Sequence, residues 1–293
     1  MPAAREAADA SLAMEAGHAL ATELRAAMRE SAAVYCEEAT KLVLLRRGRE
    51  AVANLTHAMA LQPGDPELRV RRGGALRTVG ELHRAVEDFE AAVAQAGGTH
   101  PAATRLLGLT HNDLGLAAAA RQQHAEAMAW FDLAAEPAHL PAGDRAAGLA
   151  NRADCHRACG RSAEALKDYE AALALLEPGG GGGDSGGGGE DSGGGGGDGG
   201  DARERWRISS QLASLHNERG ARLFNHANPR KAAAEFSRAI ACKPKVGHFY
   251  TNRAEATLQL NCFDLARDDV LLALRLDPTD ARAQRMLDSL CPG

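Results

Sequence analysis

The sequence predicts an all-α protein built from helix pairs that stack one on the next. Three observations support this prediction: a recurring set of alanine and large apolar residues at helical spacing, small residues where paired helices would meet, and helix-ending residues at intervals. Aromatic residues make up 4% of the chain and hydrophobic residues 45%, which suits close helix contacts better than a strand-rich core. We expect a right-handed superhelix, or solenoid, of about six helix pairs.

The recurring set is an alanine, a large apolar residue four positions later, and a second alanine three positions after that. These steps place all three side chains on one face of a helix. From Ala51 to Ala85, and again from Ala232 to Ala266, the spacing is 34 residues, a period typical of stacked helix–turn–helix units. The six sets are Ala51/Leu55/Ala58, Ala85/Phe89/Ala92, Ala127/Phe131/Ala134, Ala165/Tyr169/Ala172, Ala232/Phe236/Ala239 and Ala266/Val270/Ala273.

A small residue lies twelve positions before the first alanine of every set. Glycine or alanine at this position lets the two helices of a unit approach closely. We therefore expect these small residues and the first alanines to pack between helices. The predicted packing residues are Ala39, Gly73, Gly115, Ala153, Gly220, Ala254, Ala51, Ala85, Ala127, Ala165, Ala232 and Ala266.

The spacing of the sets is interrupted twice, and the larger interruption divides the chain. The first adds about eight residues around Gly97–Pro101, relative to the repeat period. The second is mostly a tract of glycine with Asp, Ser and Glu, which cannot bury apolar area and should be a disordered, flexible coil. Its remainder should lengthen the helix from about Arg203 to Asn225.

These features give five expected segments. They are an Ala-rich helical extension or cap at 1–30, repeats one to four at 31–178, an acidic Gly-rich linker at 179–201, repeats five and six at 202–278, and a C-terminal capping helix at 279–293. A final helix of this kind would cover the last apolar face of the array.

Several positions match the tetratricopeptide repeat. Leu114-Gly115 matches its Leu-Gly pair, Tyr35 and Tyr250 hold the aromatic position near the repeat start, and Pro63 stands where the second helix ends. From about residue 31 to 278 the chain therefore resembles the tetratricopeptide repeat superfamily. The resemblance implies a non-enzymatic scaffold that binds a protein or peptide in an inner groove.

Other segments resemble one family in particular, tetratricopeptide repeat protein 16. They are Ala85–Phe89, Leu106-Leu107 with Leu109–Asp113, Asn151–Cys155 and Leu290–Gly293. That family is longer at the N-terminus and is associated with ciliated and flagellated cells. The resemblance implies that the chain corresponds to the family's C-terminal repeats and has a scaffold role in a ciliary or flagellar assembly. It leaves open whether the chain is a full-length or a partial gene product.

The resemblance also implies which residues line the groove, since positions 2, 5, 9, 12 and 13 of each repeat face it. The lining is polar and of mixed charge, which an ordinary solvated helix face would share. The predicted groove residues are Glu67, Val70, Arg77, Asn112, Leu116, Asp154, Arg157, Asn217, Asn225, Thr251, Glu255 and Gln259.

A co-chaperone role is the alternative function. Some members of the superfamily hold the C-terminal carboxylate of heat-shock proteins with converging Lys, Arg and Asn side chains. The five positions required in the last block are occupied here by Asn217, Ala221, Asn252, Arg282 and Met286. Only Asn252 matches and Arg282 substitutes in part, so this clamp is incomplete.

Composition argues against other partners. A formal net charge of −5 leaves no basic face for nucleic acid. No apolar run of about 18 residues occurs, so membrane insertion is not expected. The N-terminus lacks an apolar signal core and the six cysteines are scattered, so we expect a cytoplasmic protein with reduced thiols. The oligomeric state stays open.

Three short strings suggest chemistry but have simpler explanations. Gly183–Gly187 spells the string around the nucleophile of chymotrypsin-like proteases, yet that chemistry needs a His and an Asp on a rigid strand scaffold. The glycine tract matches phosphate-loop spacing without the strand and helix that such a loop requires. Cys155-His156 and Cys159 have no fourth metal ligand nearby. We expect no catalytic residue, metal or cofactor.

Overall fold

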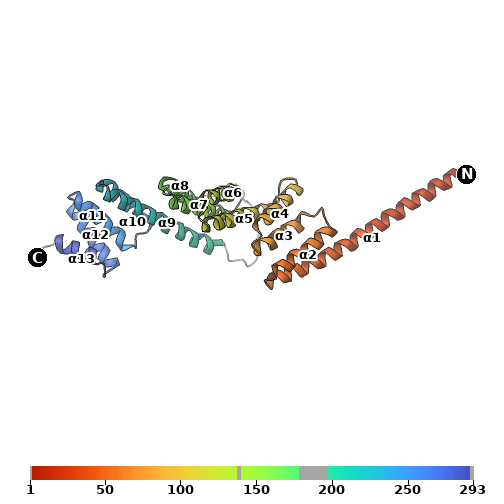
Figure 1. Ribbon diagram of the computed structural model, residues 1–293, viewed down its shortest axis with the longest axis horizontal. Helices are drawn as coiled ribbons and strands as arrows, with labels where there is room; N and C mark the ends of the chain where they lie inside the picture. The colour runs from red at the N-terminus through yellow and green to blue at the C-terminus, as the bar shows by residue number, and fades with distance from the viewer. Residues whose placement is uncertain (1, 137–139, 178–196, 291–293) are drawn as a thin grey trace, which may run out of the picture. The chain divides into compact units, whose positions relative to one another are not determined.

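Helix pairs account for the architecture. The structure is a computed structural model that describes residues 2–136, 140–177 and 197–290 (Figure 1). These residues form thirteen α-helices, and no strand occurs among them. Twelve helices make six pairs and the thirteenth follows the last pair, so the predicted all-α fold of about six helix pairs is confirmed. The chain divides into two compact units, Met1–Leu114 and Gly115–Gly293.

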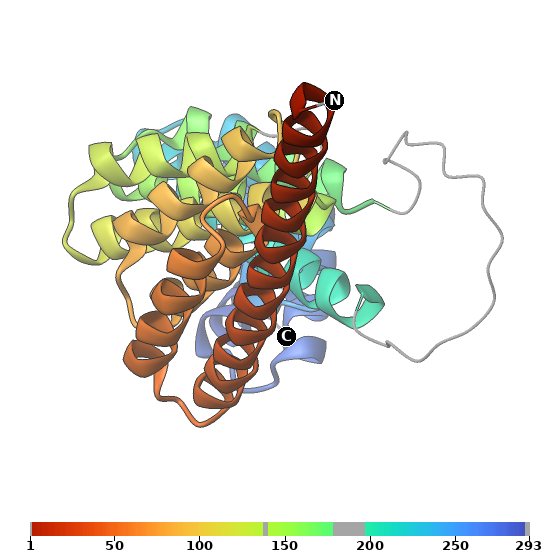
Figure 2. The ribbon, with the colours of Figure 1, turned by 90° about the vertical axis from the view of Figure 1, so that its right-hand side faces the viewer.

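The first compact unit contains two complete helix pairs and the beginning of a third. Neighbouring helices pack in sequence order, α1 on α2, α2 on α3 and α3 on α4. Figure 2 shows α1 and α2 side by side, joined by the turn between them. The helices are α1 (Pro2–Leu44), α2 (Gly48–Leu61), α3 (Pro66–Thr78), α4 (Leu82–Gln95) and the first part of α5 (Pro101–Ala120).

The second compact unit holds the remaining pairs and the final helix. Successive helices from α6 to α8 and from α8 to α13 pack on one another. The helices are α6 (His124–Ala135), α7 (Ala142–Ala158), α8 (Ser162–Leu175), α9 (Gly197–Asn225), α10 (Pro229–Cys242), α11 (Gly247–Gln259), α12 (Phe263–Leu276) and α13 (Ala281–Leu290). The apolar side chains of α13 pack on the cluster formed by α11 and α12.

Local sequence explains where several helices begin. Asp65 precedes α3 and its carboxylate accepts a hydrogen bond from the Glu67 amide at 2.9 Å, with Pro66 at the first helical position. Asn228 and Pro229 serve α10 in the same way. Side-chain acceptors satisfy free amides at a helix start, and proline lacks the amide that would otherwise be unpaired there.

Glycine packed against phenylalanine holds three of the pairs together. A Cβ atom on Gly73 would lie 2.7 Å from the Phe89 ring, and one on Gly115 would lie 2.4 Å from the Phe131 ring. Gly220 and Phe236 show the same approach at 2.6 Å. The other three pairs have alanine at the position of this glycine. All six of these small residues are buried, and so is the first alanine of every set.

A buried arginine–aspartate pair adds a polar link between the helices of three units. Arg72 with Asp88, Arg152 with Asp168, and Arg253 with Asp269 each form two hydrogen bonds of 2.5 to 2.8 Å across 16 residues. Two parallel bonds to one carboxylate give a strong and directional contact. Arg152 and Arg253 each lie in an Asn-Arg-Ala string, at residues 151–153 and 252–254. The arginines of these strings therefore contribute to packing within the repeat.

The region around the glycine tract differs from expectation in one respect. Helix α9 ends at Asn225 as predicted but begins at Gly197, inside the predicted linker. Leu176 and Ile208 share one hydrophobic cluster, so α8 and α9 pack together directly. The second compact unit therefore includes helices from both sides of the tract, and its boundary lies within α5. Residues 178–196 lie outside the described part, so the flexible linker stays a prediction.

Candidate functional site

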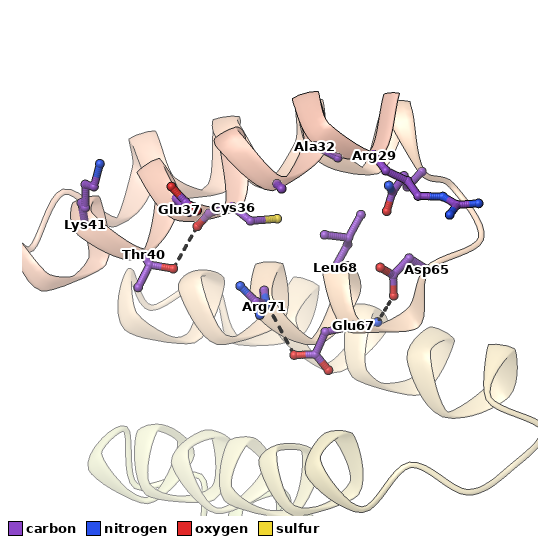
Figure 3. A pocket seen from close by; sticks show the side chains of 12 residues that line it. Arg29, Ala32, Cys36, Glu37, Thr40, Lys41, Asp65, Glu67, Leu68 and Arg71 are labelled. Carbon is purple, nitrogen blue, oxygen red and sulfur yellow. Dashed lines mark hydrogen bonds and ion pairs between the residues drawn. The ribbon is translucent and has the colours of Figure 1, made fainter. Parts of the chain in front are cut away.

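A cavity of about 590 Å³ opens between α1 and α3 in the first compact unit. Figure 3 shows α1 on one side and α3, with the turn before it, on the other. A second cavity of about 490 Å³ shares Cys36, Thr40, Glu67 and Arg71 with the first. Together they form one channel, here called the α1–α3 groove. Its lining residues are Arg29, Ala32, Ala33, Cys36, Glu37, Ala39, Thr40, Lys41, Val43, Leu44, Leu55, Gln62, Asp65, Glu67, Leu68, Arg71, Gly74 and Ala75.

Apolar atoms form the floor of the α1–α3 groove and charged side chains form its rim. Ala32 and Leu68 are buried in the floor. Two polar contacts near the rim lie within single helices: Arg71 Nε lies 3.5 Å from Glu67 Oε1, and the Thr40 hydroxyl donates to the Cys36 carbonyl at 2.9 Å. Among the described residues, no hydrogen bond or ion pair joins α1 to α3, so polar side chains do not close the groove.

Cys36 is the sulfur-containing residue of the groove floor. Burial raises the pKa of its thiol, the carboxylates of Asp65 and Glu67 raise it further, and the charge of Arg71 opposes them. A raised pKa keeps the thiol protonated near neutral pH, where it behaves as a small apolar side chain and not as a nucleophile.

The predicted groove residues of the first unit have different environments. Glu67 lines the α1–α3 groove as expected. Val70 is 6% exposed and packs in the core cluster that contains Phe89, so it does not lie on an open surface. Arg77 donates from Nε to Asp113 Oδ2 at 2.6 Å, and Asn112 is half-buried in α5.

The predicted list missed most of this groove because it included no residue of the first repeat. Ala33, Cys36 and Thr40 occupy positions 2, 5 and 9 of that repeat, and Val43 and Leu44 occupy positions 12 and 13. All five line the groove. The same positional rule, applied to residues 32–65, would have identified them.

In the second unit, polar bonds between repeats occupy two predicted residues. Arg157 of α7 donates from Nη1 to Gln211 Oε1 of α9 at 2.9 Å and lies 4.0 Å from Glu218. Asp154 of α7 accepts a hydrogen bond from the Tyr169 hydroxyl and faces Arg207 of α9 at 3.7 Å. Burial and then the bond to Asp154 raise the pKa of Tyr169.

The same arrangement continues toward the last helix. The Asn252 amide donates to Asn217 Oδ1 at 2.8 Å, and the Thr251 hydroxyl donates to Asp280 Oδ2 at 2.7 Å. Thr251 is 1% exposed, so like Val70 it does not present a surface to a partner. Glu255 forms an ion pair with Arg282 at 2.5 Å.

Three predicted groove residues of the second unit remain accessible. Leu116 is exposed and lines a small cavity of about 150 Å³ together with Asp154. Asn225 and Gln259 are exposed at the ends of α9 and α11. None of the three lines a cavity comparable in volume with the α1–α3 groove.

Residues of the incomplete carboxylate clamp already bond to side chains of this chain. Arg282 Nε donates to Glu255 Oε1 at 3.1 Å and its Nη1 donates to Asn252 Oδ1 at 3.3 Å. The matching residue Asn252 and the partial substitute Arg282 are therefore bonded to each other, and Arg282 also bonds to a carboxylate of the same unit. A carboxylate from a partner would have to displace Glu255 to reach the Arg282 guanidinium.

The described residues contain no group of three His, Cys, Asp or Glu side chains placed to hold a metal ion. Cys155 is buried in the helix interface, and burial raises the pKa of its thiol, with smaller contributions from Asp154 and Cys159. None of the described helices combines the length and apolar character needed to cross a membrane. The protease-like string at Gly183–Gly187 lies outside the described residues.

Comparison with known proteins finds relatives of one name. The chain is 26% identical over 262 residues to tetratricopeptide repeat protein 16 of Macaca fascicularis, a match that covers 88% of this chain and 26% of the relative. The Homo sapiens protein of that name is 25% identical over the same length, and the Mus musculus protein is 25% identical over 281 residues, 94% of this chain and 32% of the relative. The chain thus spans only part of the length of these relatives.

Solved structures with similar chains include a TPR repeats protein from Bacteroides fragilis, with a TM-score of 0.47, 14% identity, and coverage of 77% of this chain and 97% of that one. They also include YrrB, described as a TPR protein with an unusual peptide-binding site, with a TM-score of 0.40, 15% identity, and coverage of 79% and 96%. No protein-family model matches the chain. The chain is therefore similar in sequence to tetratricopeptide repeat protein 16, and its six helix pairs form an all-α fold of the tetratricopeptide-repeat type.

Proposed function

We propose that the protein is a non-enzymatic scaffold that holds a segment of a protein partner in the α1–α3 groove. One observation carries the proposal: this groove is apolar and has no polar bond across it among the described residues, whereas Asp154, Arg157 and Glu255 of the second unit are bonded within that unit. A partner that buries exposed apolar surface in a concave site gains binding free energy from that burial.

The groove fits an amphipathic helix of the partner. Its α1 side runs from Arg29 to Leu44, and at about 1.5 Å rise per residue this length is roughly 22 Å, or four helical turns. Such a helix would place apolar side chains on Ala33 and Leu68 and charged ones beside Lys41 and Glu37. Helices bind hydrophobic grooves through apolar side chains at three- and four-residue spacing.

We place this interaction in the cytoplasm, within a ciliary or flagellar assembly. The support is the sequence similarity to tetratricopeptide repeat protein 16, a family associated with ciliated and flagellated cells. A co-chaperone role has less support, because Glu255 and Asn252 already bond the Arg282 side chain that would receive a heat-shock carboxylate.

Proximity labelling in ciliated cells tests the proposal with a matched pair of variants. Thr40 and Thr22 are both exposed on α1, and both hydroxyls donate to the carbonyl four residues earlier, at 2.9 and 2.8 Å. Only Thr40 lines the groove. Thr40→Trp fills the groove, so at least one labelled protein should disappear, while Thr22→Trp should leave the labelled set unchanged.

Circular dichroism of both variants controls for unfolding. An unchanged set of labelled proteins with folded Thr40→Trp protein would contradict the proposed site.

A further inference from the structure

The turn that joins α1 to α2 carries an unusual combination of exposed apolar and basic side chains. It reads Val43-Leu44-Leu45-Arg46-Arg47-Gly48-Arg49. Leu44 is 79% exposed and Leu45 is 66% exposed. Burial of a leucine side chain is favourable by about 1.5–3 kcal/mol. A partner that covers these two adjacent exposed leucines would therefore gain binding free energy.

The repeat does not require the apolar and basic residues of this turn. The residue equivalent to Leu44 is small or polar in the other five helix pairs, and none of those turns has three arginines within four residues. The equivalent residues are Thr78, Ala120, Ala158, Asn225 and Gln259. The composition of the first turn is therefore a property of this site, and packing of the helix pair does not explain it.

A cavity of about 300 Å³ lies against the turn and is lined by Val43, Arg46, Gly48, Thr78 and Val79. We call it the turn pocket. A Cβ atom on Gly48 would lie 2.4 Å from Val79 Cγ1, so the turn is packed tightly on the end of α3 and the pocket wall is fixed. Val43 and Val79 supply the apolar part of the wall, Arg46 and Thr78 supply the polar part, and the volume accommodates one bulky side chain.

Arg46 lines the turn pocket, and Arg49 directly follows another lining residue, Gly48. Arg47 is bonded to Glu50 at 2.6 and 2.5 Å, whereas Arg46 and Arg49 are exposed and form no hydrogen bond or ion pair through their side chains in the described part of the chain. The backbone fixes Arg46 at φ +58°, since its amide donates to Val43 and the Arg47 amide donates to Leu42. This left-handed helix end holds the Arg46 side chain at the pocket.

We propose that the turn pocket binds an acidic peptide segment that carries one bulky apolar residue. The apolar side chain enters between Val43 and Val79, and carboxylates on either side of it pair with Arg46 and Arg49. Guanidinium groups bind carboxylates through paired hydrogen bonds. A concave pocket for a single side chain favours a peptide over a lipid surface, which would contact only the protruding leucines. This pocket shares Val43 with the α1–α3 groove, but its other lining residues do not line that groove.

The test measures fluorescence anisotropy of a labelled synthetic peptide with one phenylalanine flanked by two glutamates on each side. The double substitution Arg46→Gln with Arg49→Gln should weaken binding about tenfold or more, because two charge-assisted contacts are lost. Thr78→Tyr, which fills the pocket from an exposed position, should weaken it similarly.

A double substitution Arg230→Gln with Arg275→Gln is the charge-matched control, because both arginines are exposed in the second unit and form no ion pair through described residues. It should bind the peptide as the unmodified chain does. Thr40→Trp should also leave this binding unchanged, which separates the turn pocket from the α1–α3 groove.

Three results would overturn the proposal. The first is peptide binding that the control pair weakens as much as the pocket variants do. The second is equal binding of a peptide with lysines in place of glutamates, or with alanine in place of phenylalanine. The third is no peptide binding together with arginine-dependent binding to phosphatidylserine vesicles, which would assign the turn to a membrane surface instead.

Discussion

The α1–α3 groove and the groove positions of the second unit come from the same places in the repeat, yet their side chains do opposite things. In the first unit, Cys36, Thr40 and Arg71 bond only within their own helices or not at all, and an open apolar channel remains. In the second unit, Arg157 of α7 bonds to α9 and Glu255 of α11 bonds to α13, in each case beyond its own helix pair. Groove position alone therefore does not make a residue available to a partner; it must also lack a partner in the neighbouring repeat.

The glycine–phenylalanine contacts between paired helices should be equivalent in the two units. Substitutions at these glycines give the largest predicted change in the free energy of unfolding. Gly73→Leu in the first unit and Gly220→Leu in the second should each destabilise the protein by roughly 1–3 kcal/mol, because a side chain would overlap Phe89 or Phe236. Gly115→Leu should behave alike against Phe131. Urea unfolding measures the change.

Gly74 provides the control within the same helix, since a Cβ atom there would meet nothing within 4 Å. Gly74→Leu should not destabilise the protein. Equal destabilisation at Gly73 and Gly74 would mean that contact with phenylalanine does not explain the loss, because leucine has a higher helix propensity than glycine at both positions.

The second prediction compares one arginine from each groove region. Arg157→Met should reduce the free energy of unfolding by about 1 kcal/mol because it removes bonds to α9. Arg71→Met removes only a contact with Glu67 on its own helix, worth about 0.2–0.5 kcal/mol. Chemical denaturation that shows the larger loss at Arg71 would reverse the comparison.

The third prediction concerns acid. Burial raises the pKa of Asp280, but hydrogen bonds from Thr251 and the amides of Ala283 and Arg282, together with the Arg282 charge, lower it overall. A lowered folded-state pKa stabilises the protein above the ordinary Asp pKa of about 3.9, and this contribution is lost as pH falls through the folded-state value.

Thermal unfolding followed from pH 6 downward should therefore show a steeper loss of melting temperature near and below about pH 4 for the unmodified chain than for Asp280→Asn. Parallel curves would show that Asp280 does not contribute to this pH dependence.

The smallest effect is expected from the glycine tract. Deleting Gly180–Gly195 should leave the melting temperature nearly unchanged, because loop length changes closure entropy slowly and Leu176 and Ile208 still pack between α8 and α9. A large fall in melting temperature would show that the tract contributes to the packing of the second unit.

The sequence predicts the packing of this fold better than its surface. Gly115 and Phe131 lie in one repeat at fixed spacing, so their contact follows from periodicity. The Arg157–Gln211 bond joins residues 54 positions apart. An insertion lies between them, so the repeat period does not predict that these two side chains meet. Its position in the repeat predicts that Val70 lines the groove, but Val70 is buried in the core cluster that also contains Phe89 and Ala103.

Site-specific photo-crosslinking in ciliated cells tests the central claim most directly. A benzoyl-phenylalanine is introduced at Thr40 in the α1–α3 groove, at Thr22 outside it on the same helix, and at Gln259 among the groove positions of the second unit. The account predicts a discrete crosslinked partner from position 40 and none from positions 22 and 259. A partner crosslinked from position 259 with none from position 40 would contradict it.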